Sequence, residues 1–316
     1  MYSFVLWYTP GCTNCAGQGG DKKEAWVHIN LWKEGSHEKG PIKIDFGIMV
    51  RGIDDIKSIH LYSPFAFQSC EDLAGLLREN PPLIRAVFNE SYEFDSGEQD
   101  FIIRPKEGDP FILHALLMGQ DLNVQGRIIT INTETMGKPL KQYYFRFRIT
   151  IPRENDRGLI STHKRDISRF SDYLTSTEII DFRLNDIRSC DRECRNHIGR
   201  GSLFGIRSVN YFILRDPADL VIYHGGETRC RHLEPEIWEP YGLPREKRLI
   251  AYHFYQRAPK KDGNGHEHIR DFSVLVRFQR QEAKILIILA LTLLLGLLGG
   301  LAAGLAANFI SFKLGW

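Results

Sequence analysis

Alternation of hydrophobic and polar residues with a period of two runs through most of the first 280 positions. Stretches rich in Val, Ile and aromatic residues are separated by Gly, Pro and Asp, which is typical of half-buried strands joined by turns. We expect strands at residues 2–9, 25–32, 42–50, 56–62, 100–104, 110–117, 126–132, 143–151, 208–214, 220–223, 249–255 and 272–278. Short strands at this spacing predict a mainly β, sandwich-like antiparallel fold with a few inserted helices.

The stretch at residues 143–151 has the sharpest alternation in the chain. Its sequence, YYFRFRITI, places Tyr144, Arg146, Arg148 and Thr150 on one face and apolar or aromatic residues on the other. Such a pattern predicts a strand of an antiparallel sheet with one buried face and one solvated face.

Helical periodicity interrupts the strands in three places. Ser69 is the expected N-cap of a first helix, whose apolar face begins at Leu73, and a second short helix is expected at residues 83–88. After a charged linker, the spacing of apolar residues across 164–185 also predicts a helix.

A long apolar run at residues 285–310 breaks the pattern near the end of the sequence. It contains no charged residue, and its polar side chains are Thr292 and Asn308. Because about 20 apolar residues suffice to cross a bilayer core as a helix, the run predicts a single transmembrane helix.

Basic residues flank this run unequally. One lies downstream, Lys313, and four lie within about 20 residues upstream: Arg270, Arg277, Arg280 and Lys284. Cytoplasmic flanks carry the excess of Lys and Arg. We therefore expect a tail-anchored membrane protein with its large N-terminal part in the cytoplasm and a short far-side tail at 311–316.

The predicted elements divide the chain into five parts. Residues 1–151 form a β-rich cytoplasmic domain or its first half, and 202–280 form a second β-rich part. Between them, residues 152–201 are interpreted as a linker and helical segment. The transmembrane helix and the tail are the last two parts. The pattern leaves open whether the two β-rich parts form one domain or two.

Small residues recur every fourth position in the apolar run. Gly296, Gly300 and Gly304 continue to Asn308 on one helix face. Small residues at this spacing let two helix backbones approach closely, and Asn308 can hydrogen-bond between helices. We expect the helix to self-associate and the protein to form a homo-oligomer in the lipid membrane.

Composition narrows the possible functions. The net charge is +2, and acidic residues are interleaved with basic ones, so no nucleic-acid surface is expected. The sequence also lacks a phosphate-binding glycine loop, a nucleophile elbow and a His-Glu-x-x-His motif. We therefore do not favour an enzyme.

Cysteine and histidine supply one candidate metal site. Cys190, Cys194 and His197 share a short segment, and Cys230 and His232 alternate in another. These are ligands that structural zinc prefers, in close pairs, so a structural zinc is the cofactor we consider.

A further pair, Cys12 and Cys15, could complete that zinc site. The pair follows a predicted strand and resembles the Cys-x-x-Cys turn of thioredoxins and glutaredoxins. The glycine-rich residues after it are a poor helix start, and thiol redox chemistry needs the first cysteine at a helix N-terminus.

Three functions are compatible with these features. The first is a membrane-anchored sensor, and possible membrane effector, whose cytoplasmic β-rich domain binds a small-molecule or protein ligand and whose helix oligomerises. The alternatives are a membrane tether or adaptor of a complex, and a metal-dependent enzyme using the Cys/His set. We favour the first because a simple tether has no need of glycines in register.

Overall fold

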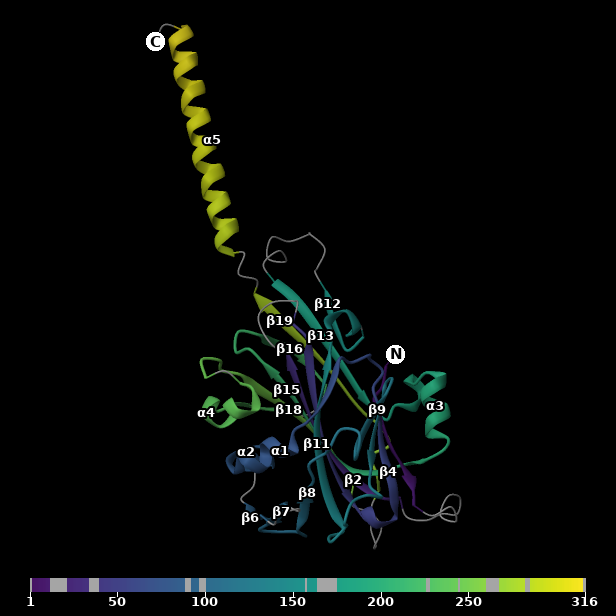
Figure 1. Cartoon of the computed structure of the whole chain (residues 1–316). Helices are drawn as coiled ribbons and strands as arrows, with labels where there is room; N and C mark the ends of the chain where they lie inside the picture. Colours follow the sequence, from purple (N-terminus) through teal and green to yellow (C-terminus); the bar gives the residue numbers. More distant parts are fainter. Residues whose placement is uncertain are drawn as a thin grey trace.

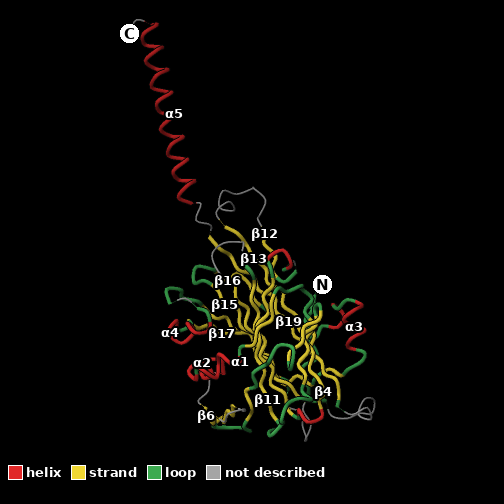
Figure 2. Tube along the Cα trace, viewed as in Figure 1, coloured by secondary structure: helices red, strands yellow, loops and turns green. Residues whose placement is uncertain are grey.

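The computed structural model describes residues 2–11, 22–33, 40–88, 92–96, 101–156, 158–163, 175–225, 228–243, 245–259, 267–281 and 285–314. Figure 1 shows a β-rich domain from which the C-terminal helix α5 (Ile285–Leu314) projects. Strands fill the domain and short helices lie around it (Figure 2). The expected fold class is confirmed: mainly β, with short helices and one long apolar helix.

Three sheets make up the domain. The five-stranded sheet has the order β14 (Ser202–Leu203), β1 (Val5–Pro10), β4 (Ile56–Tyr62), β10 (Ile128–Asn132) and β9 (Leu122–Gln125). The four-stranded sheet has the order β12 (Ile160–His163), β13 (Thr175–Leu184), β19 (Phe272–Gln281) and β16 (Leu220–His224). All of the strand pairs within these two sheets are antiparallel.

The largest sheet has ten strands. Its order is β17 (Thr228–His232), β18 (Ile250–Arg257), β15 (Gly205–Arg215), β2 (Glu24–Lys33), β3 (Ile42–Arg51), β11 (Gln142–Ile151), β8 (Phe111–Leu113), β7 (Phe101–Pro105) and β6 (Tyr92–Ser96), with β5 (Ser69–Asp72) also paired to β11. Two of its pairs are parallel, β15 with β2 and β11 with β8. Because β15 pairs with β2, the two β-rich stretches of the sequence share one sheet.

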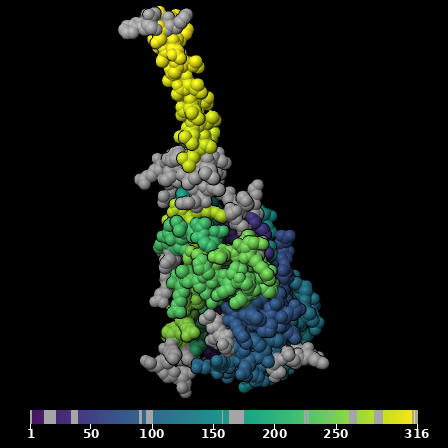
Figure 3. Space-filling model, turned by 90° about the vertical axis from the view of Figure 1, so that its left-hand side faces the viewer, coloured from purple at the N-terminus to yellow at the C-terminus, as the bar shows by residue number. Residues whose placement is uncertain are grey.

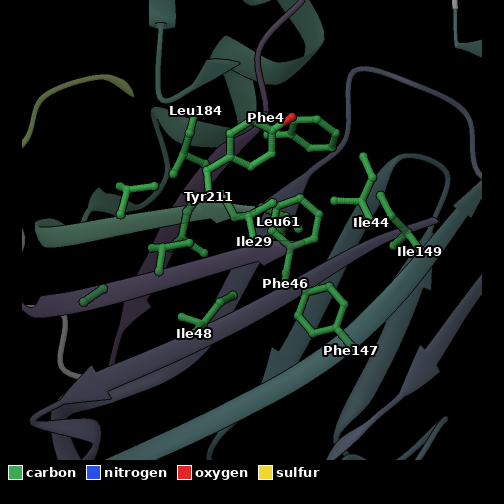
Figure 4. Close-up of a cluster of buried hydrophobic side chains, with 14 of the residues drawn as sticks. Phe4, Ile29, Ile44, Phe46, Ile48, Leu61, Phe147, Ile149, Leu184 and Tyr211 are labelled. Atoms are coloured by element: carbon green, nitrogen blue, oxygen red, sulfur yellow. The ribbon is translucent and has the colours of Figure 1, made fainter. Parts of the chain in front are cut away.

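The main hydrophobic core lies between the sheets. Alternate residues of β2, β3, β11 and β15 face inward and meet the inner faces of the two smaller sheets. Figure 4 shows this cluster, including Phe46, Phe147, Leu61, Leu184 and Tyr211. The period-two pattern seen in the sequence is the pattern of this buried face.

A second core lies on the outer face of the ten-stranded sheet. It is covered by α1 (Ala74–Glu79), α2 (Pro81–Phe88), α4 (Pro235–Trp238) and the 3-10 helix η6 (Glu239–Tyr241). The other helical turns are η2 (Ile53–Asp55), η3 (Arg153–Asn155), η5 (Ile187–Ser189) and α3 (Arg192–Ile198). Of these, η5 and α3 border a third cluster, which lies against Val5 and Trp7 of β1.

This second layer corrects the interpretation of β11 as a one-sided strand. The polar face of β11 is buried, with Tyr144 and Arg146 both at 0% exposure and Arg148 at 8%. Alternation alone cannot distinguish a solvated polar face from one that meets buried partners. Here the partners come from a distant segment, η6, and from the neighbouring strand β3.

Two helix predictions are also wrong in part. Residues 175–184 form strand β13, in which alternate residues point inward, including Ile180, Phe182 and Leu184. Residues 164–174, the rest of that predicted helix, lie outside the described residues. Ser69 belongs to strand β5 rather than a helix N-cap; α1 begins at Ala74, and the Asp72 carboxylate accepts the Gly75 amide at 3.0 Å.

Buried charges join the ten-stranded and four-stranded sheets. Lys33 and Arg215, at the ends of β2 and β15, both pair with Glu178 of β13. Arg215 also contacts Asp219 at 2.8 Å, and Asp219 lies 3.8 Å from Arg280 of β19. This cluster ties β19, the described strand before α5, to the large sheet.

A second buried ionic network centres on Asp45, which is completely buried on β3. Its carboxylate accepts Arg148 Nε and Trp32 Nε1, each at 2.6 Å, and lies 3.9 Å from Arg146 Nη2. Arg146 in turn donates to the Tyr241 hydroxyl of η6 at 2.6 Å. The network therefore fastens the helical layer to the sheet.

Replacing Asp45 by Asn should destabilise the protein strongly. The substitution keeps the shape but leaves two buried guanidinium groups without the carboxylate they share, which costs about 3–5 kcal/mol in buried pairs. The measurement is urea unfolding of the full chain in non-ionic detergent. Asp54→Asn, at an exposed position on η2, is the matched control, and a D45N protein as stable as that control would contradict the role given to the network.

Candidate ligand-binding pocket and membrane segment

A pocket of about 600 Å³ opens on the outer face of the ten-stranded sheet. Its floor comes from β2, β15 and β18, one wall from the C-terminal end of α2, and the opposite wall from β17. In Figure 3 the green chain around residues 200–250 lies beside the blue chain around residues 70–110 on this side of the domain. The pocket is the part of this face that the helical layer leaves open.

Strand register places the floor residues side by side. Trp26 and His28 of β2 pair with Ser208 and Asn210 of β15. Across β2, His28 is opposite Gly47 of β3. A Cβ at that glycine would overlap the Tyr144 hydroxyl, so glycine makes the room in which Tyr144 crosses beneath the pocket.

His28 links the pocket to the buried network. Its Nδ1 lies 3.4 Å from the Tyr144 hydroxyl, which accepts Arg146 Nη1 at 2.8 Å. Burial, with smaller effects from Arg146 and His253, lowers the pKa of His28 to about 3. His28 is therefore neutral at physiological pH.

His253 forms the second histidine of the floor. Its ring stacks on Phe212 at a centroid distance of 4.2 Å and an interplanar angle of 8°. Its Nε2 lies 3.0 Å from Asn210 Oδ1. Burial, and then Arg229 and Arg231, lower the pKa of His253 to about 4, so this side chain is also neutral.

Three exposed arginines surround the mouth: Arg229 and Arg231 on β17 and Arg257 on β18. Arg231 Nη2 donates to the Ala86 carbonyl of α2 at 3.3 Å, and the Arg229 guanidinium lies 5.7 Å from the Tyr255 ring centroid. None of the described residues that line the pocket is Asp or Glu. The pocket therefore carries positive potential at its rim.

This pocket was not predicted from the sequence. Its residues come from strands that are far apart in sequence, so no local motif exists. One signal was available: His28, Ser208 and Asn210 are polar residues on one face of strands whose other face is apolar. In central strands of a large sheet, such positions are candidates for a buried polar site.

The proposed zinc ligands occupy two separate parts of the fold. Cys190 follows η5, and Cys194 and His197 lie on α3, against the five-stranded sheet. Cys230 and His232 lie on β17 of the ten-stranded sheet, and Cys230 lines the pocket. Within the described part of the chain, no group of three His, Cys, Asp or Glu residues could hold a metal. Cys12 and Cys15 lie outside the described residues.

Cys190 and Cys194 pack together beneath Trp7 and Tyr62. The hydrogen bond to Cys190, together with burial, raises the pKa of the Cys194 thiol. The same hydrogen bond lowers the pKa of the Cys190 thiol. In the described structure these two cysteines contribute to packing.

α5 is long and apolar enough to cross a membrane. The segment Ile288–Ser311 has a mean hydropathy of 2.3, and none of its most apolar window is buried against the rest of the chain. Thr292, Gly296, Gly300, Gly304 and Asn308 line one shallow groove along the helix. No atom lies within 4 Å of where a Cβ on the three glycines would be, so the groove is open.

No protein-family model matches the chain, and no curated protein matches it. Function is therefore inferred from the pocket and α5.

The lowered pKa of His28 predicts how stability depends on pH. The unfolded chain, with a histidine pKa of 6.5, binds the proton more readily than the folded one. The stabilisation is complete above pH 6.5 and is lost as the pH falls toward 3, at up to about 1.4 kcal/mol per pH unit.

Unfolding of the full chain in urea between pH 7 and pH 4 measures this slope. His28→Gln should make it shallower, whereas His232→Gln, at an exposed position on β17, serves as the control. Equal slopes for wild type and H28Q would show that His28 is not held neutral by the fold.

Proposed function

We propose that this chain is a single-pass membrane sensor and effector. Its β-rich domain lies on the cytoplasmic side and binds a ligand in the sheet pocket, and α5 crosses the bilayer and self-associates. The observation that carries the proposal is the presence, in one chain, of an unburied apolar helix of 24 residues and a built pocket on the folded domain.

The membrane assignment is supported by the surroundings of α5. Its leucines are more than half exposed over most of its length, for example Leu293 at 69% and Leu297 at 67%. A soluble protein would bury such a surface, and a bilayer removes it from water without further protein contacts. The four basic residues upstream of the helix, against one downstream, support the cytoplasmic orientation.

Self-association is supported by the groove on α5. Three glycines form its floor, and Asn308 lies in the same groove. Thr292 Oγ1 donates to the Ile288 carbonyl at 2.8 Å within its own helix, whereas the Asn308 amide is exposed. A second copy of the same helix would fill the groove and give Asn308 a partner.

A membrane tether is the main alternative, and the groove argues against it. A helix that only anchors a domain needs apolar length and no close-packing face. The metal-enzyme alternative finds no support in the described residues, which contain no metal-binding group of three.

Deleting residues 285–316 should release the protein from membranes. The wild-type chain should sediment with membranes and resist extraction by alkaline carbonate, because hydrocarbon solvates the apolar face of α5. Fractionation by ultracentrifugation measures the change. Replacing the segment with an unrelated single-pass helix is the control, and should restore sedimentation; membrane association of the deleted chain would refute the anchor.

Gly300→Ile should weaken self-association about ten-fold, because a branched side chain fills the groove and separates the helix backbones. Förster transfer between labelled full-length chains in vesicles reports the association. Ala302→Ile introduces the same side chain about 200° around the helix from Gly300, outside the groove, and should have no effect. Equal weakening by both substitutions would argue against the glycine face.

A further inference from the structure

Within the proposed ligand-binding function, the chemistry of the pocket indicates the class of ligand. The described lining residues supply hydrogen-bond donors and positive charge, and none of them supplies a carboxylate. A pocket of this kind suits a ligand that is rich in acceptor oxygens and negatively charged.

The buried network favours one direction for the hydrogen bond between Tyr144 and His28. Arg146 can only donate, so the Tyr144 oxygen accepts its proton, and the Tyr144 hydroxyl keeps its own proton to donate to His28 Nδ1. Neutral His28 then carries its own proton on Nε2, at the other end of the ring. It lines the pocket as a donor rather than an acceptor.

The hydrogen bond between His253 and Asn210 also has a defined direction. The Asn210 amide oxygen can only accept, so the neutral His253 ring donates to it from Nε2. The Asn210 NH₂ group is then available as a donor in the floor beside His28, its partner in the strand register. Two uncharged side chains in the floor therefore offer N–H groups.

The rim adds charge to these donors. Arg229 and Arg257 are exposed and lie on adjacent strands. Arg229 is opposite His253 in the register, and its guanidinium lies 5.7 Å from the ring of Tyr255, two residues before Arg257. Guanidinium groups bind phosphate with two parallel hydrogen bonds and keep their charge at every physiological pH. Phosphate is therefore the anion that best matches this rim.

The remaining lining is apolar and aromatic. Trp26, Met49 and Phe88 line the cavity, whereas the Phe212 and His253 rings of the floor stack on each other. Aromatic side chains such as Trp26 and Phe88 bind flat rings by stacking. The pocket thus combines a surface for a planar ring with a cationic rim.

We infer that the pocket binds a nucleotide, with its base against the aromatic side chains of Trp26 and Phe88 and its phosphate at Arg229 and Arg257. This inference rests on the proposed ligand-binding function and specifies its substrate class. A cavity of about 600 Å³ is within the range of small-molecule sites.

Isothermal titration of the full-length protein in non-ionic detergent tests the inference. The probes are AMP, GMP, CMP and UMP, the four matching nucleosides, and inorganic phosphate. At least one nucleotide should bind saturably, and its nucleoside and inorganic phosphate should each bind at least about ten-fold more weakly, because each lacks one half of the recognised chemistry.

Arg229→Gln and Arg257→Gln should each weaken binding of that nucleotide about ten-fold. Both positions are exposed, so the melting temperatures of the variants should match wild type. Either variant alone is therefore enough to test the contact with the nucleotide. Arg192→Gln, an exposed position on α3 at the five-stranded sheet, removes the same charge and should bind normally.

Several results would overturn the nucleotide inference: no binding by any of the four nucleotides, equal binding of nucleotide and nucleoside, equal binding of nucleotide and phosphate, or unchanged affinity in both arginine variants. Membrane sedimentation and the Gly300→Ile effect are measured on the same preparations. Their failure would refute the proposed function, whereas failure of nucleotide binding alone would refute only the ligand class.

Discussion

The carboxylate of Asp45 is the interaction on which the outer half of the domain depends. Arg148 and Trp32 donate to it, and Arg146 lies beside it, all on the face of the large sheet that points away from the main core. Two guanidinium groups cannot be buried on a sheet without a shared anion and further acceptors. Tyr241 and Tyr144 supply those acceptors for Arg146. One carboxylate thereby stabilises the polar face of β11, which would otherwise need contact with solvent.

The polar face of β11 also determines which part of the sheet the helical layer covers and which part stays open. The Arg146–Tyr241 bond holds η6, and with it Trp238, over β2 and β11. The Arg146–Tyr144 bond points the other way, toward His28 in the pocket floor. The same guanidinium therefore contacts the residue that holds η6 over the sheet and the residue that reaches His28. Breaking a buried ionic network of this type is costly even where its net contribution to stability is small.

The sequence was sufficient to predict strands and the apolar helix, because both depend on local periodicity. The expected strands at 42–50, 56–62 and 143–151 match β3, β4 and β11 closely. It was not sufficient to predict what lies on each face. Arg146 and Arg148 look like solvated residues in an alternating strand, and their burial results from Asp45 and Tyr241, about 100 residues away in either direction. The pocket was missed for the same reason, since β2, α2, β15, β17 and β18 meet only in the folded chain. The Cys/His grouping failed to predict proximity, because Cys194 lies on α3 beside the five-stranded sheet and Cys230 on β17 of the ten-stranded sheet.

The pocket and strand β19 are linked through the two central strands of the large sheet. His28 and Asn210 lie in the pocket floor, and five residues further along the same strands are Lys33 and Arg215, about 17 Å away. There both cations meet Glu178, and Arg215 meets Asp219, whose carboxylate lies near Arg280 of the strand that precedes α5. The two strands that form the pocket floor therefore also hold β19 in place through their ends. A ligand bound in the pocket would lie on these same two strands.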